Sequence, residues 1–256
     1  MTATDIVAAR PGPRSWLKLT AAELKMVVRD TSGLIVPIAL PVLILVMSAS
    51  TASQQVVANG RTALDVFVLP LVTAIILSTI CIINMPSFLA YYRHAGILRR
   101  LAVTPASPAM VLVAHTVVSL VQALVGMCVA LALAVLAFDA NAPVHLWAAI
   151  GIFALSLVAF YGIGMVVASV APSPNSAVAI GLALFFAIGA LGGMFGGTGN
   201  LPEALETVGE WLPFGATVQA LGAAWAGAAI DSVHVISLAV SAVVGIAVAA
   251  VAFRWD

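Results

Sequence analysis

Long runs without a charged residue constrain this chain more than any other feature. One run separates Asp30 from Arg61, and the run from Asp139 to Glu203 is long enough for two membrane crossings. A helix needs about 20 residues to cross the hydrocarbon core of a bilayer. With 63% hydrophobic and 8% charged residues, the 256-residue chain has more apolar surface than a soluble core could bury. The sequence therefore predicts an all-α integral membrane protein.

The charged residues divide this apolar sequence into six expected spans, because a charged side chain is costly in hydrocarbon. The longest interval contains the turn signal APSPNS at 171–176, which splits it into two helices. We expect a single domain over residues 1–256. Its expected transmembrane helices are 32–52, 65–88, 108–138, 145–170, 177–197 and 232–253.

Basic residues predict the orientation, since loops rich in Lys and Arg stay in the cytoplasm. Six crossings place nine of the ten basic residues on one side and leave only Arg61 on the other. Counting 211–230 as a seventh crossing would move Arg254 outside, and the proline and glycines of that stretch weaken a full span. We expect a protein of the cytoplasmic membrane with both termini cytoplasmic. In that layout 211–230 is an outer re-entrant segment, surrounded by protein or a water-filled cavity.

Two amphipathic stretches flank the spans. Residues 14–29 carry a basic stripe opposite apolar residues, which favours an interfacial helix on the inner surface, with a solvated helix face as the alternative. Residues 200–230 begin with a short helix on the outer surface and continue into the re-entrant segment. The acidic face of that short helix either attracts cationic substrates or is simply solvated; it comprises Glu203, Glu206 and Glu210.

Motifs for nucleotide, metal and hydrolytic chemistry are missing from the sequence. It contains no G-x-x-x-x-G-K-[ST] loop, no H-E-x-x-H motif and no G-x-S-x-G elbow. Cys81 and Cys128 lie in apolar segments, and we expect small buried residues there rather than a disulfide or a metal pair. We expect no bound cofactor and no catalytic residue in this chain. Three polar residues within the spans are candidates for interhelical hydrogen bonds or for substrate contact: Asn84, His115 and Gln122.

The loop after the second expected span reads YYRHAGILRRLAVTPASP at 91–108. Arg93, Gly96, the Ile97-Leu98 pair, Leu101 and Thr104-Pro105 give this loop a pattern that resembles the membrane subunit of ABC-2 type exporters. Within that family the chain resembles the daunorubicin-resistance-like permeases in particular. The amphipathic first helix, the six-span layout and a Leu-Pro-Phe element at 212–214 extend the resemblance over essentially the whole chain.

The resemblance implies that 91–105 is a cytoplasmic coupling helix and turn, which docks into an ATPase subunit. An apolar patch rimmed by arginines is also a reasonable docking surface on physical grounds. Family members carry glutamates where this chain has Tyr91, Tyr92 and His94. The alternative is that the arginines only enforce topology and contact phospholipid. The expected docking residues are Arg93, Gly96, Ile97, Leu98, Arg99, Arg100 and Leu101.

The resemblance further implies an ATP-driven exporter for a hydrophobic or amphiphilic cargo, namely a drug, a lipid or a glycolipid, with multidrug or antibiotic resistance as one outcome. Its expected partners are two ABC ATPase subunits carrying ATP and Mg, a second permease copy or paralogue, and membrane lipid, with no nucleic acid. One alternative is a secondary carrier, which predicts inverted repeats with interrupted spans in both halves. Another is a membrane assembly subunit that transports nothing itself.

Overall fold

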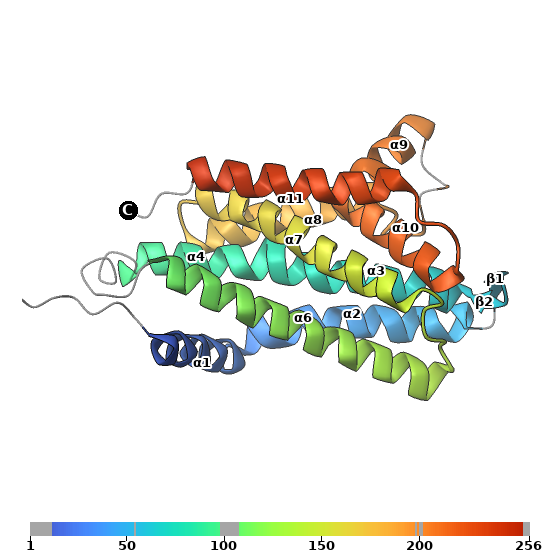
Figure 1. The fold of residues 1–256 in the computed structure, drawn as a ribbon, viewed down its shortest axis with the longest axis horizontal. Helices are drawn as coiled ribbons and strands as arrows, with labels where there is room; N and C mark the ends of the chain where they lie inside the picture. Colours follow the sequence, from blue (N-terminus) through green and yellow to red (C-terminus); the bar gives the residue numbers. More distant parts are fainter. Residues whose placement is uncertain (1–11, 54, 98–107, 198, 200–201, 253–256) are drawn as a thin grey trace, which may run out of the picture.

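The computed structural model describes residues 12–53, 55–97, 108–197, 199 and 202–252, which form an elongated helical bundle (Figure 1). A small antiparallel hairpin, β1 (Val56–Ala58) and β2 (Arg61–Thr62), lies at one end. The helices are α1 (Pro13–Arg29), α2 (Thr31–Ala52), α3 (Leu69–Ser78), α4 (Met85–His94), α6 (Pro108–Phe138), α7 (Leu146–Val170), α8 (Pro174–Leu191), α9 (Glu203–Trp211), α10 (Pro213–Ala226) and α11 (Ser232–Ala252). Two π-helical segments, η1 (Leu64–Val68) before α3 and η2 (Thr79–Asn84) between α3 and α4, are continuous with these helices. Residues Leu64–His94 therefore form one long helix.

The all-α membrane architecture is confirmed. Five helices in the described part are long and apolar enough to cross a membrane, and Ser232–Val248 forms a shorter apolar helix. The number of crossings remains a prediction. The five long helices are Gly33–Ala52, Leu64–His94, Met110–Phe138, Leu146–Val170 and Pro174–Leu191.

Three boundaries differ from those expected. The fifth span starts at Pro174 rather than 177. The fifth span ends at Leu191 rather than 197, because Gly193, Gly196 and Gly197 adopt left-handed backbone conformations that end the helix. The second span continues to His94 rather than ending near 88.

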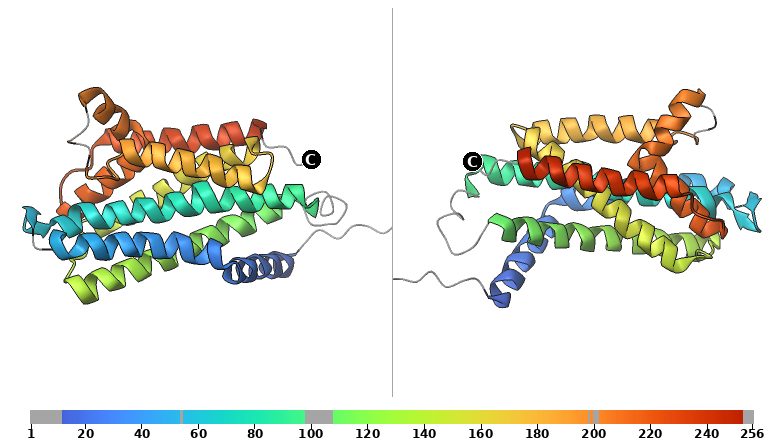
Figure 2. Two further views of the ribbon diagram at one scale, coloured as in Figure 1. Left: turned by 180° about the vertical axis from the view of Figure 1, so that it is seen from behind. Right: turned by 45° about the horizontal axis from the view of Figure 1, so that its top comes forward.

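The two ends of the bundle differ in charge. The end that carries α1, the last turn of α4 and the first turn of α6 is called the basic end (Figures 1 and 2). The opposite end, with the β1–β2 hairpin and α9, is called the hairpin end. Helix α1 lies at the basic end and α11, the last described helix, runs back towards it (Figure 1), as an even number of crossings requires. Which end faces the cytoplasm remains a prediction.

The long helix from Leu64 to His94 forms the centre of the bundle. In its apolar window 83% of the residues are buried, against 22–50% for the other four long helices. Gly164 of α7 and Gly181 of α8 approach the carbonyl groups of Cys81 and Ile82 in η2, where a Cβ atom would clash. A π-helical turn widens the helix, so only glycines allow neighbours to pack this closely against it.

The stretch 211–230, expected to be re-entrant, contains the helix α10, which is enclosed by the bundle. All but two of its 14 residues, Gln219 and Ala223, are buried. At about 1.5 Å per residue, α10 is also too short to cross a hydrocarbon core of about 30 Å. It ends at Gly227, whose left-handed conformation caps the helix. This packing is what a re-entrant segment requires, since its surroundings must be protein or water.

A buried carboxyl group organises the hairpin end. Asp65 is fully buried and accepts hydrogen bonds from the backbone N–H of Asn141 at 2.8 Å and from its side-chain amide at 2.9 Å. The N–H of Thr62 donates to the same carboxyl group at 3.2 Å. The Trp225 indole in turn donates to the Asn141 carbonyl at 3.1 Å. The hairpin, the loop before α7 and the end of α10 are therefore held together around Asp65.

Candidate functional site at the basic end of the bundle

Asn84 and Gln122 meet at a single backbone carbonyl. Both side-chain amides donate to the oxygen of Gly33 in the first turn of α2, each at 2.6 Å. In a regular helix this oxygen would accept the N–H of residue 37. Residue 37 is proline, which has no N–H to donate. The two amides, one at the N-cap of α4 and one on α6, therefore replace the single hydrogen bond that Pro37 removes, as expected for a proline within a membrane helix.

A second polar cluster joins α1 to the bundle through Glu23. This side chain is buried, and the Tyr92 hydroxyl donates to its Oε2 at 2.5 Å. His115 of α6 places its Nδ1 3.7 Å from the same oxygen, which makes an ion pair only when the imidazole is protonated. The distance is too long for a hydrogen bond, and in the described part of the chain Nδ1 has no hydrogen-bond partner. The Phe88 ring, 5.3 Å from the imidazole, closes the cluster.

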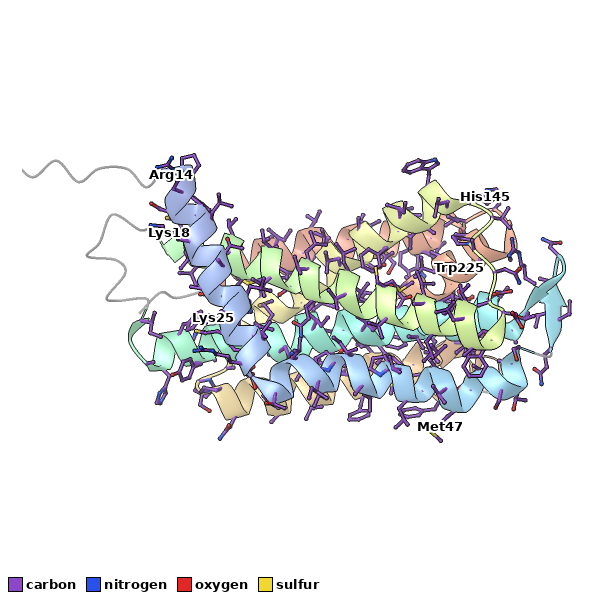
Figure 3. The ribbon with its side chains drawn as sticks, turned by 90° about the horizontal axis from the view of Figure 1, so that it is seen from below. Arg14, Lys18, Lys25, Met47, His145 and Trp225 are labelled. Atoms are coloured by element: carbon purple, nitrogen blue, oxygen red, sulfur yellow. The ribbon has the colours of Figure 1, made fainter. Side chains whose placement is uncertain are left out.

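Helix α1 presents three different faces. Glu23 and Val27 are its buried residues and turn towards the bundle. A second, exposed face is apolar and consists of Leu17, Leu24 and Val28. The third face is the basic stripe, and α1 carries it across the end of the bundle (Figure 3). The exposed stripe residues are Arg14, Lys18, Lys25 and Arg29. An exposed apolar face beside a basic face is the arrangement of a helix that lies at a membrane surface.

Arg93 binds the end of a neighbouring helix. Its guanidinium donates to the Ala168 carbonyl at 3.2 Å and to the Ala171 carbonyl, at the C-terminus of α7. The last carbonyls of a helix lack intrahelical donors, so a cation there satisfies them and interacts favourably with the helix dipole. This contact keeps the last turn of α4 in the bundle, which explains why the second span extends to His94. The guanidinium of Arg93 thus has partners within the chain, and its contact with an ATPase stays a prediction.

The helix break in the loop comes at Gly96. Gly96 follows Ala95, the C-cap of α4, and has a left-handed conformation with φ +66°; its N–H donates to the Arg93 carbonyl at 3.1 Å. Ile97 is half-buried against Tyr92 and Val111, so it packs on the bundle rather than projecting from it. Within the expected coupling segment 91–105, residues 91–94 thus complete α4, and a turn follows at residues 95 and 96. The other expected docking residues, Leu98, Arg99, Arg100 and Leu101, lie outside the described residues, as does the Thr104-Pro105 turn.

The family model for ABC-2 type transporters matches residues 14–224, from the first turn of α1 to α10. The chain belongs to the ABC-2 type transporter family. A comparison with curated proteins found no match. This ABC-2 permease is thus a multi-pass membrane protein and a membrane component of a transporter, a role that is not itself catalytic.

The remaining predicted residues of this ABC-2 permease lie elsewhere. The acidic residues Glu203, Glu206 and Glu210 are on α9 at the hairpin end, far from the polar clusters (Figure 1). Cys81 is buried in η2, as expected for a small core residue. Cys128 was expected to be buried too, but it is exposed on α6, because that helix turns one side away from the bundle.

Sequence reasoning missed two buried polar residues that hold elements of the fold together, Glu23 and Asp65. Neither acidic residue was among the predicted site residues, and the structure buries both with hydrogen-bond partners. For Glu23 a signal existed in the sequence, because helical periodicity places it opposite the basic stripe of α1. For Asp65 no comparable signal existed, since Asn141 lies 76 residues away.

Proposed function

We propose that this ABC-2 permease is the membrane subunit of an ATP-driven exporter in the cytoplasmic membrane. It would move a hydrophobic or amphiphilic substrate, such as a drug, a lipid or a glycolipid, outward. Two ATPase subunits would dock at the basic end and carry the ATP and Mg, and a second permease copy or paralogue would complete the pathway. The positive-inside rule supports a cytoplasmic basic end, since Arg61 is the exception among the described basic residues.

The proposal depends on one observation: the last part of the Leu64–His94 helix, just before residues 98–107, contacts several other helices. Within one helix, Asn84 binds α2, Tyr92 binds α1 and Arg93 binds α7. Hydrogen bonds in a low-dielectric interior resist separation, because each broken one leaves a polar group unpaired. A force applied just beyond Gly96 would therefore move several helices together rather than bend one loop. That is the mechanical property that a coupling segment needs.

The driving energy would come from the partner subunits. Without a phosphate-binding loop in its sequence, this chain offers no expected site for nucleotide hydrolysis. Nucleotide binding between the two ATPases would change their separation, and the docked segments would carry that displacement to α1, α2 and α7. Each of the two membrane halves would then rock as a unit, because its helices are cross-linked by the contacts described above.

The test is purification of the tagged chain from its native membrane in mild detergent, followed by identification of the proteins that accompany it. The Arg99→Glu/Arg100→Glu variant reverses two charges in the expected docking segment. The matched control, Arg14→Glu/Lys18→Glu, reverses two exposed charges on α1 at the same end of the bundle. We expect a P-loop ATPase and ATP hydrolysis with the wild type and the control, and a loss of both with the docking variant.

Two results would contradict the proposal. If no ATPase accompanies the wild type under conditions that keep a known ABC complex intact, the proposal of ATP-driven export is wrong. A secondary carrier then becomes the favoured function. If the two variants lose the ATPase equally, the general positive charge of this end attracts the partner, and the loop after Gly96 is not a specific docking segment.

A further inference from the structure

A cavity of about 260 Å³ lies between α6 and α7, away from the polar clusters. Leu124 and Cys128 of α6 and Ile150 of α7 form its exposed rim, while Leu221 and Trp225 of α10 form its inner wall. The rim belongs to two helices that qualify as membrane spans, so the cavity opens sideways from the bundle. Figure 3 shows Trp225 at the same end of the bundle as His145, the residue that precedes α7.

The lining has no free polar group to offer a ligand. Apart from the weakly polar Cys128 thiol, its donors are the Thr73 hydroxyl and the Trp225 indole. The Thr73 hydroxyl donates to the Leu69 carbonyl at 2.8 Å and contacts the Met127 sulfur at 3.2 Å. The Trp225 indole N–H is bound to the Asn141 carbonyl. Small-molecule sites usually contain a few polar groups that orient the ligand. A lining without them suits a purely aliphatic ligand, as apolar cavities stay dry and accept apolar guests.

The length and depth of the cavity match part of one leaflet. Its lining extends from Leu124 to Leu131 on α6 and from Leu146 to Phe153 on α7. The seven helical rises between these limits on each side correspond to about 10 Å, against about 15 Å for half of the hydrocarbon core. Trp147, 82% exposed, follows the first of the α7 residues and has the exposure typical of an interfacial tryptophan. The cavity therefore starts near the interface at the hairpin end and extends inward.

We propose that this cavity binds one acyl chain of a membrane lipid from the leaflet at the hairpin end. Both flanking helices expose apolar side chains beside the rim, so hydrocarbon surrounds the opening. An acyl chain is the apolar ligand present there in excess, and filling the space recovers dispersion contacts that an empty cavity loses. The inference goes beyond the proposed function, because it requires only that the chain spans a membrane and does not depend on ATP-driven export.

The experiment reconstitutes the full chain into phosphatidylcholine vesicles with a minor fraction of phosphatidylcholine that carries a diazirine on one acyl chain. After irradiation, labelled residues are located by mass spectrometry. Leu221 and Trp225 are only 1% and 3% exposed, so lipid that merely surrounds the bundle reaches them poorly. Label on these two residues of α10 therefore reports an acyl chain inside the cavity. We expect label there in addition to label on the exposed surface of α6.

Two tryptophan variants make the test specific. Cys128→Trp fills the rim, whereas Val129→Trp adds the same side chain to the next residue, which is exposed and does not line the cavity. We expect label on Leu221 and Trp225 to fall severalfold in Cys128→Trp and to stay unchanged in Val129→Trp. If Cys128→Trp does not fold, Ile150→Trp blocks the opposite rim.

Three outcomes would overturn the proposal. One is wild-type label confined to exposed residues, with none on α10. Another is label on α10 that Cys128→Trp leaves at the wild-type level. A third is disulfide formation between the Cys128 residues of two copies under mild oxidation, together with absence of label on α10, which would show that a second copy covers the cavity.

Discussion

Replacement of Pro37 by alanine should make the amides of Asn84 and Gln122 largely dispensable. Both amides donate to the Gly33 carbonyl, whose usual helical donor is absent because residue 37 is proline. Pro37→Ala restores an N–H four residues after Gly33, so the carbonyl regains a partner within α2. The energetic cost of losing the amides should then depend on which residue occupies position 37.

The expected magnitudes follow from the number of donors that remain. Asn84→Ala or Gln122→Ala alone leaves one amide on the carbonyl and should cost about 1 kcal/mol of unfolding free energy. The double variant leaves the carbonyl without either amide, and an unsatisfied buried acceptor raises the total cost to about 3 kcal/mol. In the Pro37→Ala background the same double substitution should cost about 1 kcal/mol, which gives a coupling energy of about 2 kcal/mol.

The assay is reversible unfolding in mixed detergent micelles, titrated with sodium dodecyl sulfate and followed by circular dichroism. Gln219→Ala removes the same amide group from an exposed position on α10 and should change stability by less than about 0.5 kcal/mol. Equal costs of the double substitution with proline and with alanine at position 37 would refute the reasoning. The amides would then stabilise the bundle by packing alone, and the missing N–H of Pro37 would be irrelevant to them.

Two further substitutions test the buried carboxyl groups. Tyr92→Phe removes the hydroxyl that binds Glu23 and should weaken the attachment of α1 to the bundle by about 1.5 kcal/mol. Trypsin should therefore cleave α1 about tenfold faster than in the exposed control Tyr91→Phe. Equal cleavage in the two variants would mean that this hydrogen bond does not hold α1. Asp65→Asn should lower the unfolding free energy by about 2 kcal/mol, because the new NH2 group faces N–H donors instead of accepting from them. In the same detergent titration, Asp139→Asn at an exposed position of the same end should be nearly neutral. A neutral Asp65→Asn would contradict the role given to this carboxyl group.

The helices themselves were predictable because lipid leaves few choices for an apolar chain. Every backbone N–H and carbonyl in hydrocarbon needs an internal partner, so charge-free runs of sufficient length become helices wherever they occur. The first span, expected at 32–52, is Thr31–Ala52, and the third has the expected limits, Pro108–Phe138. The second span was expected to end near 88 because Arg93 looked too costly for a helix inside the bundle. Its guanidinium instead binds the end of α7, a partner that follows 75 residues later.

The candidate site could be predicted only as a set of residue types. Polar side chains within apolar helices predict interhelical hydrogen bonds, which Asn84 and Gln122 form. Their common acceptor was not visible, because Gly33 lies 51 residues from one and 89 from the other. In the sequence, Pro37 and the two amides were separate features. The fold makes them parts of one arrangement, since the amides complete the hydrogen bonding that the proline interrupts.

The sequence by itself determined that the chain spans a lipid bilayer, that it is helical, and that basic and acidic residues gather at opposite ends. These properties depend on local composition and on the spacing of charges, and both can be read from the sequence without knowledge of the fold. Only the tertiary structure decided that Glu23 and Asp65 are buried with partners, that Arg93 binds α7, and that α6, α7 and α10 leave a cavity between them. Each of these features requires residues far apart in the chain to meet. Which of them meet depends on how the helices pack, and helix packing is a property of the whole chain.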